Sequence, residues 1–178
     1  GPAVDGPDLR DPLLRHRIDQ LHGVLAAPGR DHGRDDLEAA GRLALIRERL
    51  LGHFGRGAHR RDPSPGRAAE PVRPDPRLAR KLRELLDARV PSGLTLDEAS
   101  GMLHAHPAHL VRAFTRAYGI PPHRYLTGRR IDLARRLLLA GHRPAEVATL
   151  AGFFDQPHFT RHFRRMLGTT PAAYARRA

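Results

Sequence analysis

The apolar residues of this chain recur at helical spacing along most of its length. The pattern predicts helices over residues 12–26, 35–52, 76–88, 95–103, 107–118, 122–140, 144–151 and 156–167, and a last short helix that holds Tyr174. Because no segment alternates apolar and polar residues with a period of two for long, no β-strand is predicted. We therefore expect an all-α fold.

The first two predicted helices form an αα-hairpin within residues 1–54. Its apolar stripes are Leu13, Leu14, Ile18, Leu21, Val24 and Leu25 in one helix, and Leu37, Ala40, Leu43, Ile46, Leu50 and Leu51 on one side of the other. A hairpin of about 40 residues is too small to bury both stripes by itself. It must pack on the rest of the chain, on a second copy or on something outside this sequence. Residues 55–75 carry Gly, Pro and Arg without an aliphatic stripe, which predicts a flexible linker.

One stretch of sequence occurs twice, 49 residues apart. His109, Leu110, Arg112, Phe114, Arg116, Gly119, Pro122 and Tyr125 recur as His158, Phe159, Arg161, Phe163, Arg165, Gly168, Pro171 and Tyr174. Each copy predicts a short helix, a turn and an Arg-rich second helix. This is the layout of a helix-turn-helix unit, whose second helix enters the major groove of DNA. The units span about residues 94–119 and 144–168, with a linker helix over 122–140.

Helical spacing divides each second helix into an inner and an outward face. Phe114 and Phe163 belong to the predicted core, and Tyr125 and Tyr174 are predicted packing residues with their hydroxyls on backbone. The residues left for the outside are His109, Arg112, Arg116, Gln156, His158, Thr160, Arg161, Arg164 and Arg165. Arg can bond guanine bidentately and Gln can do so with adenine, while Arg and Thr also bind phosphates. For Arg112 and Arg161, a base contact, a phosphate contact and no contact all stay open. Arg164 and Arg165 suit phosphate contacts or solvent.

The charge of the chain is concentrated in its second part. The formal net charge is +12, and residues 75–178 hold 18 Arg and Lys against 8 Asp and Glu. Such a basic segment favours a polyanionic partner, with a solvated basic surface as the alternative. A basic membrane-surface helix is less suited, because no segment pairs a basic face with a broad aromatic one.

Several other functions find no support in the sequence. The chain has no Cys, which excludes disulfides and thiolate metal sites. His158 and His162 have a spacing that two metal ligands can use, but no third ligand at a fixed spacing accompanies them. No nucleophile motif, phosphate-binding Gly loop or membrane-spanning apolar run occurs. We expect neither an enzyme nor a cofactor.

The segment from Gly152 to Tyr174 carries a family resemblance. It reads Gly-Phe-Phe-Asp-Gln-Pro-His-Phe-Thr-Arg-His-Phe-Arg-Arg-Met-Leu-Gly-Thr-Thr-Pro-Ala-Ala-Tyr and resembles the conserved segment of AraC/XylS-type transcription regulators. With the first copy and the linker helix, the resemblance covers about residues 76–178. It implies a seven-helix domain in which two helix-turn-helix units, joined by a rigid helix, enter successive major-groove faces about 34 Å apart.

The resemblance also implies which residues read bases. In the first unit the family's positions fall on Ala108, Val111 and Arg112, and in the second on Gln156, Pro157, Thr160 and Arg161. The turn of the first unit has His104 where the family usually has Gly, whereas the second unit keeps Gly152. The second unit is therefore expected to do more of the reading. The linker helix is expected to fix the separation of the units through Leu126, Leu133 and Leu137.

The resemblance further implies an upstream sensing domain, whose barrel is absent from this sequence. Residues 12–52 are similar to the helices that follow such a barrel and dimerise. We thus expect a cytoplasmic bacterial protein of the nucleoid that binds double-stranded promoter DNA sequence-specifically and regulates transcription. RNA polymerase and a second copy, through residues 12–52, are further candidate partners, and no membrane is expected. The alternatives are a nonspecific DNA-architectural protein and a dimerisation fragment of a regulator.

Overall fold

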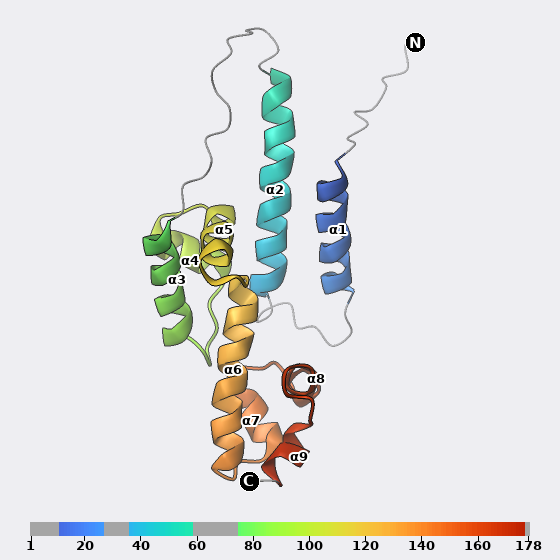
Figure 1. Cartoon of the computed structure of the whole chain (residues 1–178), viewed down its shortest axis with the longest axis vertical. Helices are drawn as coiled ribbons and strands as arrows, with labels where there is room; N and C mark the ends of the chain where they lie inside the picture. Colours follow the sequence, from blue (N-terminus) through green and yellow to red (C-terminus); the bar gives the residue numbers. More distant parts are fainter. Residues whose placement is uncertain (1–10, 27–35, 59–74, 177–178) are drawn as a thin grey trace.

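A computed structural model gives the fold of the chain and describes residues 11–26, 36–58 and 75–176. Within these ranges the chain forms helices and no strand, so the all-α prediction is confirmed. The helices are α1 (Pro12–Leu25), α2 (Asp36–Ala58), α3 (Pro76–Ala88), α4 (Leu96–Leu103), α5 (Pro107–Tyr118), α6 (Pro122–Leu139), α7 (Pro144–Leu150), α8 (Gln156–Leu167) and α9 (Pro171–Ala175) (Figure 1). Helices α3 to α9 are the seven that the family resemblance implies.

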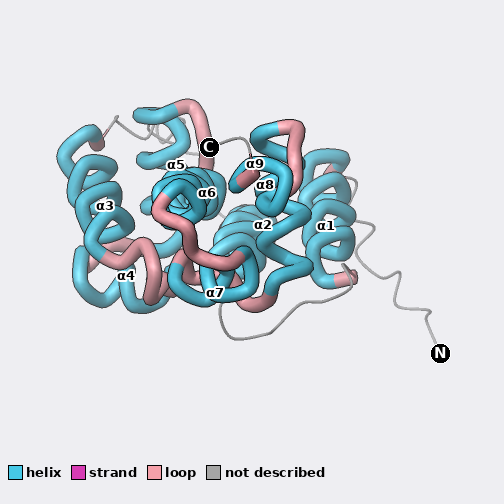
Figure 2. The backbone as a smooth tube through the Cα atoms, turned by 90° about the horizontal axis from the view of Figure 1, so that it is seen from below, coloured by secondary structure: helices cyan, strands magenta, loops and turns pink. Residues whose placement is uncertain are grey.

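Helix α6 is the axis of the fold, with other helices grouped around it in the end-on view of Figure 2. Its first part, through Leu126, joins a core built mainly by α3, α4 and α5. Its second part, through Ile131 and Leu138, joins a separate core with α7 and α8. Leu133 packs against both cores. The predicted spacing role of Leu126, Leu133 and Leu137 therefore fits the packing, because one continuous helix is anchored in both units.

A second connection ties the two units together beside α6. The buried Arg130 of α6 donates from Nε to the backbone oxygen of Val90 at 3.0 Å, in the loop that follows α3. The turn of the second unit lies against the same loop, because a Cβ added at Gly152 would come within 2.2 Å of the backbone oxygen of Pro91. Gly152 also has a φ of +83°, a conformation that L side chains rarely adopt. Both the backbone conformation and the close approach therefore require glycine.

The turn of the first unit has the same left-handed backbone without glycine. His104 ends α4 with a φ of +48°, and its backbone N–H is bonded to the oxygen of Ser100. The helix that it ends is fixed at its other end by a capping box, in which Thr95 and Glu98 bond to each other's backbone N–H groups. The first unit therefore keeps the helix-turn-helix layout although His104 stands where the family usually has Gly.

The hairpin of α1 and α2 differs from the prediction in two respects. Helix α2 runs on to Ala58, so residues 55–58 are helical and not linker, while residues 59–74 lie outside the described residues. The apolar residues of α2 also do not share one side. Ile46 is buried, Leu37 is buried in the core of the first unit, and Leu43 and Leu51 are each 56% exposed.

The aromatic rings of the repeat pack in the two cores as predicted, but the tyrosine hydroxyls bond to other groups than predicted. Phe114 and Phe163 are fully buried in the two cores. The hydroxyl of Tyr125 donates to the carboxylate of Asp87 at 3.0 Å, and that of Tyr174 accepts from Nε of Arg135 at 3.1 Å. The prediction of backbone partners is therefore wrong, because both hydroxyls reach charged side chains.

The joint at Gly152 generates a testable prediction. Replacing Gly152 with Ala should lower the free energy of unfolding by about 1–2 kcal/mol for the left-handed backbone, and by a further 1–3 kcal/mol, roughly, for the clash with Pro91. Thermal unfolding measures the loss. Gly101→Ala is the matched control, because Gly101 is an exposed position of α4 with no atom within 4 Å of its would-be Cβ, and alanine should be neutral or stabilising there. Equal stability of the two variants would contradict the account of the joint.

Candidate nucleic-acid interface

The second helix-turn-helix unit places α8 with one face inward and one face outward. Asp155 caps the start of α8 by accepting from the backbone N–H of His158 at 2.6 Å, and Gly168 ends it in the left-handed conformation. Phe159 and Phe163 are fully buried on its inner face, where Phe153 also packs. The inner aromatic residues thus fix the rotation of α8 about its own axis, and that rotation decides which side chains face outward.

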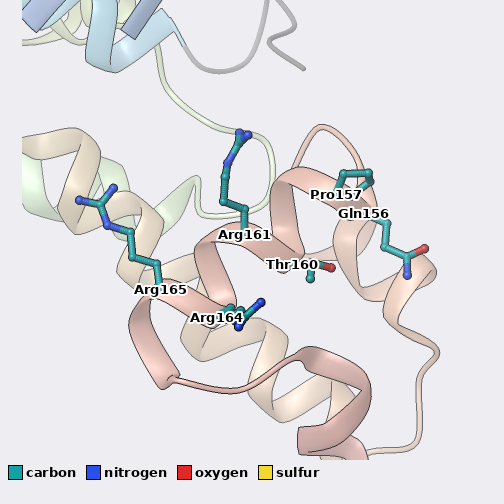
Figure 3. Close-up of a pocket in the computed structure, with 6 residues that line it drawn as sticks. All are labelled: Gln156, Pro157, Thr160, Arg161, Arg164 and Arg165. Atoms are coloured by element: carbon teal, nitrogen blue, oxygen red, sulfur yellow. The ribbon is translucent and has the colours of Figure 1, made fainter. Parts of the chain in front are cut away.

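Six of the predicted site residues lie together on the outward face of α8. They line an open hollow with a volume of about 780 Å³ and are Gln156, Pro157, Thr160, Arg161, Arg164 and Arg165. Figure 3 shows the three arginines projecting away from the helix ribbon. Thr160 is half-buried and the other five are exposed. We call this set the α8 face. It combines three guanidinium groups with a hydroxyl and an amide, which are donors and acceptors suited to phosphates and base edges.

His158 does not belong to the α8 face, which corrects its predicted place on the outside. Its side chain is only 6% exposed. The ring lies 5.7 Å from that of Phe153 and 4.5 Å from that of His162, measured between centroids. The position was predicted to point outward from helical spacing alone, but the loop before α8 brings Phe153 over it.

The corresponding face of α5 in the first unit is covered. Ala108 is fully buried and Val111 is 7% exposed, although the family resemblance places both among the base-reading positions. The side chain of Arg112 donates to the carboxylate of Glu48 on α2 and forms an ion pair with it. In this structure Val111 and Arg112 contact α2, and Ala108 is buried in the core of the first unit. Of the other predicted residues, His109 has Nε2 3.9 Å from the carboxylate of Asp75, and Arg116 is exposed.

Of the α2 residues that pack on the first unit, the apolar stripe predicted from the sequence contains Leu37 but not Gly41, Ala44 or Glu48. Leu37 and Ala44 are buried in the core of the first unit, and a Cβ added at Gly41 would lie 3.5 Å from Cγ2 of Val111. With Glu48, these residues form a stripe at helical spacing. Two of the four are small, so the stripe carries a weak apolar signal. The available hint was the small residues themselves, which allow two helices to approach closely.

The pair formed by Glu48 and Arg112 shifts the ionisation of the carboxyl group. The hydrogen bond from Arg112 lowers the pKa of Glu48 below its usual 4.5, against the opposing effect of burial. The charges of Arg112, His106 and Arg17 lower this pKa further. The ionised form of Glu48 is therefore favoured where α2 meets α5.

The described part of the chain shows neither a metal-binding cluster nor a membrane-spanning helix. Among those residues, no three His, Asp or Glu side chains are placed to hold a metal ion together. None of the described helices has the length and apolar character that crossing a membrane requires. The α8 face is therefore the strongest candidate site.

Comparison with known proteins gives the same reading of this region. A family profile described as a helix-turn-helix domain matches residues 99–177. The probable transcriptional regulator LumQ of Photobacterium leiognathi is 33% identical over 82 residues, which are 46% of this chain and 33% of LumQ. The chain therefore spans about a third of that relative's length.

Solved structures share the fold of the domain. A probable AraC family transcriptional regulator from Rhodopseudomonas palustris matches with a TM-score of 0.54 and 25% identity, covering 57% of this chain and 97% of that one. The DNA-binding domain of the global transcriptional factor AdpA, in complex with a target DNA, matches with a TM-score of 0.52 and 25% identity. That match covers 56% of this chain and 90% of the AdpA chain.

The ion pair of Glu48 and Arg112 gives a prediction with a definite sign. Folding lowers the pKa of the Glu48 carboxyl, so the pair stabilises the folded state at pH values above the pKa of the unfolded chain. This stabilisation is lost as the pH falls through the lower pKa of the folded state. An NMR titration should find the pKa of Glu48 below 4.5 in the wild type. In an Arg112→Gln variant the pKa should rise, because burial then acts with less opposition. An unchanged pKa in that variant would show that the pair does not form.

Proposed function

We propose that the protein is a transcription regulator that binds double-stranded promoter DNA sequence-specifically. The proposal rests on residues 99–177, which form an AraC-type helix-turn-helix domain. In this proposal α8 is the principal recognition helix and enters the major groove. Helix α5 is the corresponding helix of the first unit. The DNA complex of the similar AdpA domain supports the assignment of this fold to duplex DNA.

The observation that carries the proposal is the composition and placement of the α8 face. Gln156, Thr160 and Arg161 follow one another at helical spacing on the outward side of a helix whose rotation is fixed by buried rings. A well-placed bidentate contact discriminates against a wrong base by about 1–3 kcal/mol. Arg164 and Arg165, further along the same helix, are placed for phosphate contacts, which position a protein on DNA without reading it.

The linker helix has dimensions that suit two units on one side of a duplex. Helix α6 has 18 residues and is therefore about 27 Å long at 1.5 Å per residue. Successive major-groove faces on one side of DNA are about 34 Å apart. Because α6 is buried in the cores of both units, its length holds the two recognition helices at a separation of the same order, which supports a bipartite site.

A nonspecific DNA-architectural protein is the alternative that the charge favours equally. Residues 75–178 carry a net charge of +10, and such a surface binds any duplex with a steep dependence on salt.

We propose two further partners in addition to promoter DNA. RNA polymerase would act as the partner in transcription, and a second copy would use the exposed Leu25 of α1 and Leu51 of α2.

Two arginines of α8 separate the specific from the nonspecific reading. Arg161→Ala should weaken binding to the cognate duplex by about 1–3 kcal/mol and relax the sequence preference. Arg165→Ala should weaken binding to all duplexes alike and reduce the dependence of affinity on salt, because a phosphate contact carries no sequence information. Titrations with cognate and scrambled duplexes at several salt concentrations measure both effects.

Arg136→Ala is the matched control, since it removes the same charge from an exposed position of α6 outside the α8 face. It should leave the sequence preference unchanged. If Arg161→Ala weakens the cognate and the scrambled duplex equally, Arg161 contacts phosphate only. If the wild type itself does not distinguish the two duplexes, the architectural alternative is correct.

A further inference from the structure

Helix α2 lies beside α5 of the first helix-turn-helix unit (Figure 1), against the face that carries Val111 and Arg112. Of the three positions that the resemblance assigns to base reading in α5, Val111 and Arg112 contact α2. Ala108 and Val111 are buried, and Arg112 is held by Glu48 of α2. By contrast, the hollow on the α8 face is open, with exposed Arg164 and Arg165. The recognition helix of the second unit is therefore accessible to DNA, whereas that of the first unit is not.

The space on α5 is too small for α2 and DNA together. The backbone of α2 is close to α5, because the would-be Cβ of Gly41 lies 3.5 Å from Cγ2 of Val111. Two packed helices lie about 8–10 Å apart and each is about 10–12 Å across, so together they measure roughly 20 Å. The major groove is about 12 Å wide and admits one helix. While α2 stays in place, α5 cannot enter the groove.

The charges of α2 also replace those that DNA would bring. Glu48 pairs with Arg112, and Glu38 has a carboxylate oxygen 3.6 Å from Nε2 of His123 at the start of α6. The lowered pKa of Glu48 keeps its carboxylate charged in this contact. Helix α2 thus offers negative charge to Arg112 of the first unit, as a phosphate backbone does.

The contact between α2 and the first unit is small enough to be reversible. The buried apolar side chains of α2 in it are Leu37 and Ala44, with Ala40 and Leu45 partly buried, so among the described residues of α2, Leu37 is the one large side chain that is buried there. The hairpin is held together by other contacts on a different side of α2. Arg49 pairs with Asp11 at 2.6 Å, and Arg17 donates to the backbone oxygen of Leu45 at 3.1 Å. Helices α1 and α2 can therefore leave α5 as one unit.

From these contacts we infer that the hairpin of α1 and α2 is an autoinhibitory element that blocks the first helix-turn-helix unit. This inference rests on the proposed function, because it concerns the access of α5 to the same DNA. In the closed form the protein binds with α8 alone. Release of the hairpin exposes α5, and both units then bind successive faces of one duplex. Because the apparent affinity scales with the fraction of competent protein, weakening the closed contact should strengthen DNA binding.

Two neighbouring positions of α2 provide a matched test in the full chain. Ala44 is 9% exposed and faces the first unit, whereas Leu43 is 56% exposed. Ala44→Glu places a charge inside the contact, four residues from Glu48, and Leu43→Glu adds the same charge outside it. Added negative charge by itself weakens binding to DNA. An increase in affinity for Ala44→Glu therefore cannot come from the general charge of the protein.

The probe is a pool of random-sequence duplexes, each longer than two helical turns, from which the wild type and both variants enrich bound molecules. The affinities of all three proteins are then compared on the duplex that Ala44→Glu enriches. We expect Ala44→Glu to bind about tenfold more tightly or better, which corresponds to about 1.4 kcal/mol. Its footprint should cover two major-groove faces one turn apart. The wild type and Leu43→Glu should protect one.

A reversible lock tests the same inference without destabilising the contact. The chain has no Cys, so Gly41→Cys with Val111→Cys introduces the only pair, at positions in direct contact. The oxidised protein should bind the enriched duplex about tenfold more weakly than the same protein after reduction. Equal binding in the two states, or failure of the disulfide to form under oxidation, would overturn the inference.

The outcomes separate this inference from the proposed function. If the wild type and Ala44→Glu bind one enriched sequence with equal affinity and equal footprints, the protein reads DNA but the hairpin does not inhibit it. If no protein of the set, including the reduced double variant, enriches any sequence, both the proposed function and the inference fail.

Discussion

The burial of α6 in two hydrophobic cores is the constraint on which the arrangement of this protein depends. Leu126 is anchored in the first core and Ile131 in the second, only five positions further along, while Leu133 packs against both. A helix held in this way cannot rotate for one unit without disturbing the other. The contact of Gly152 with Pro91 and the bond from Arg130 to Val90 add a second connection beside the helix. The two recognition helices are therefore held at a fixed distance and orientation relative to each other.

This rigidity gives a physical reason for the unequal use of the two units. Helix α8 presents its arginines around an open hollow, while α5 lies under α2. Because α6 fixes the position of α5 relative to α8, the first unit cannot turn aside to escape α2. Access to it must change through movement of the hairpin. The duplication in the sequence thus produces one architecture twice, and the hairpin makes the two copies inequivalent.

Much of the fold followed from local signals, and what was missed depends on distant contacts. The bounds of α3, α5 and α8 agree with the prediction because prolines, capping residues and glycines mark helix ends within a few positions. The partner of Arg112 could not be found in this way, since Glu48 lies 64 residues earlier in the chain. The stripe on α2 contains Gly41 and Ala44, whose small side chains give little apolar periodicity. His158 was misplaced because spacing within a helix does not show what the preceding loop lays over it.

The central claim is that α8 reads the sequence of a duplex. Selection of bound molecules from a random duplex pool by the wild-type protein, at a salt concentration near the physiological value, tests this claim most directly. The account predicts enrichment of a short motif, and the loss of its preferred base when Arg161 is replaced. Retention of duplexes without any enriched motif would contradict it and would show that the basic surface binds DNA without reading it.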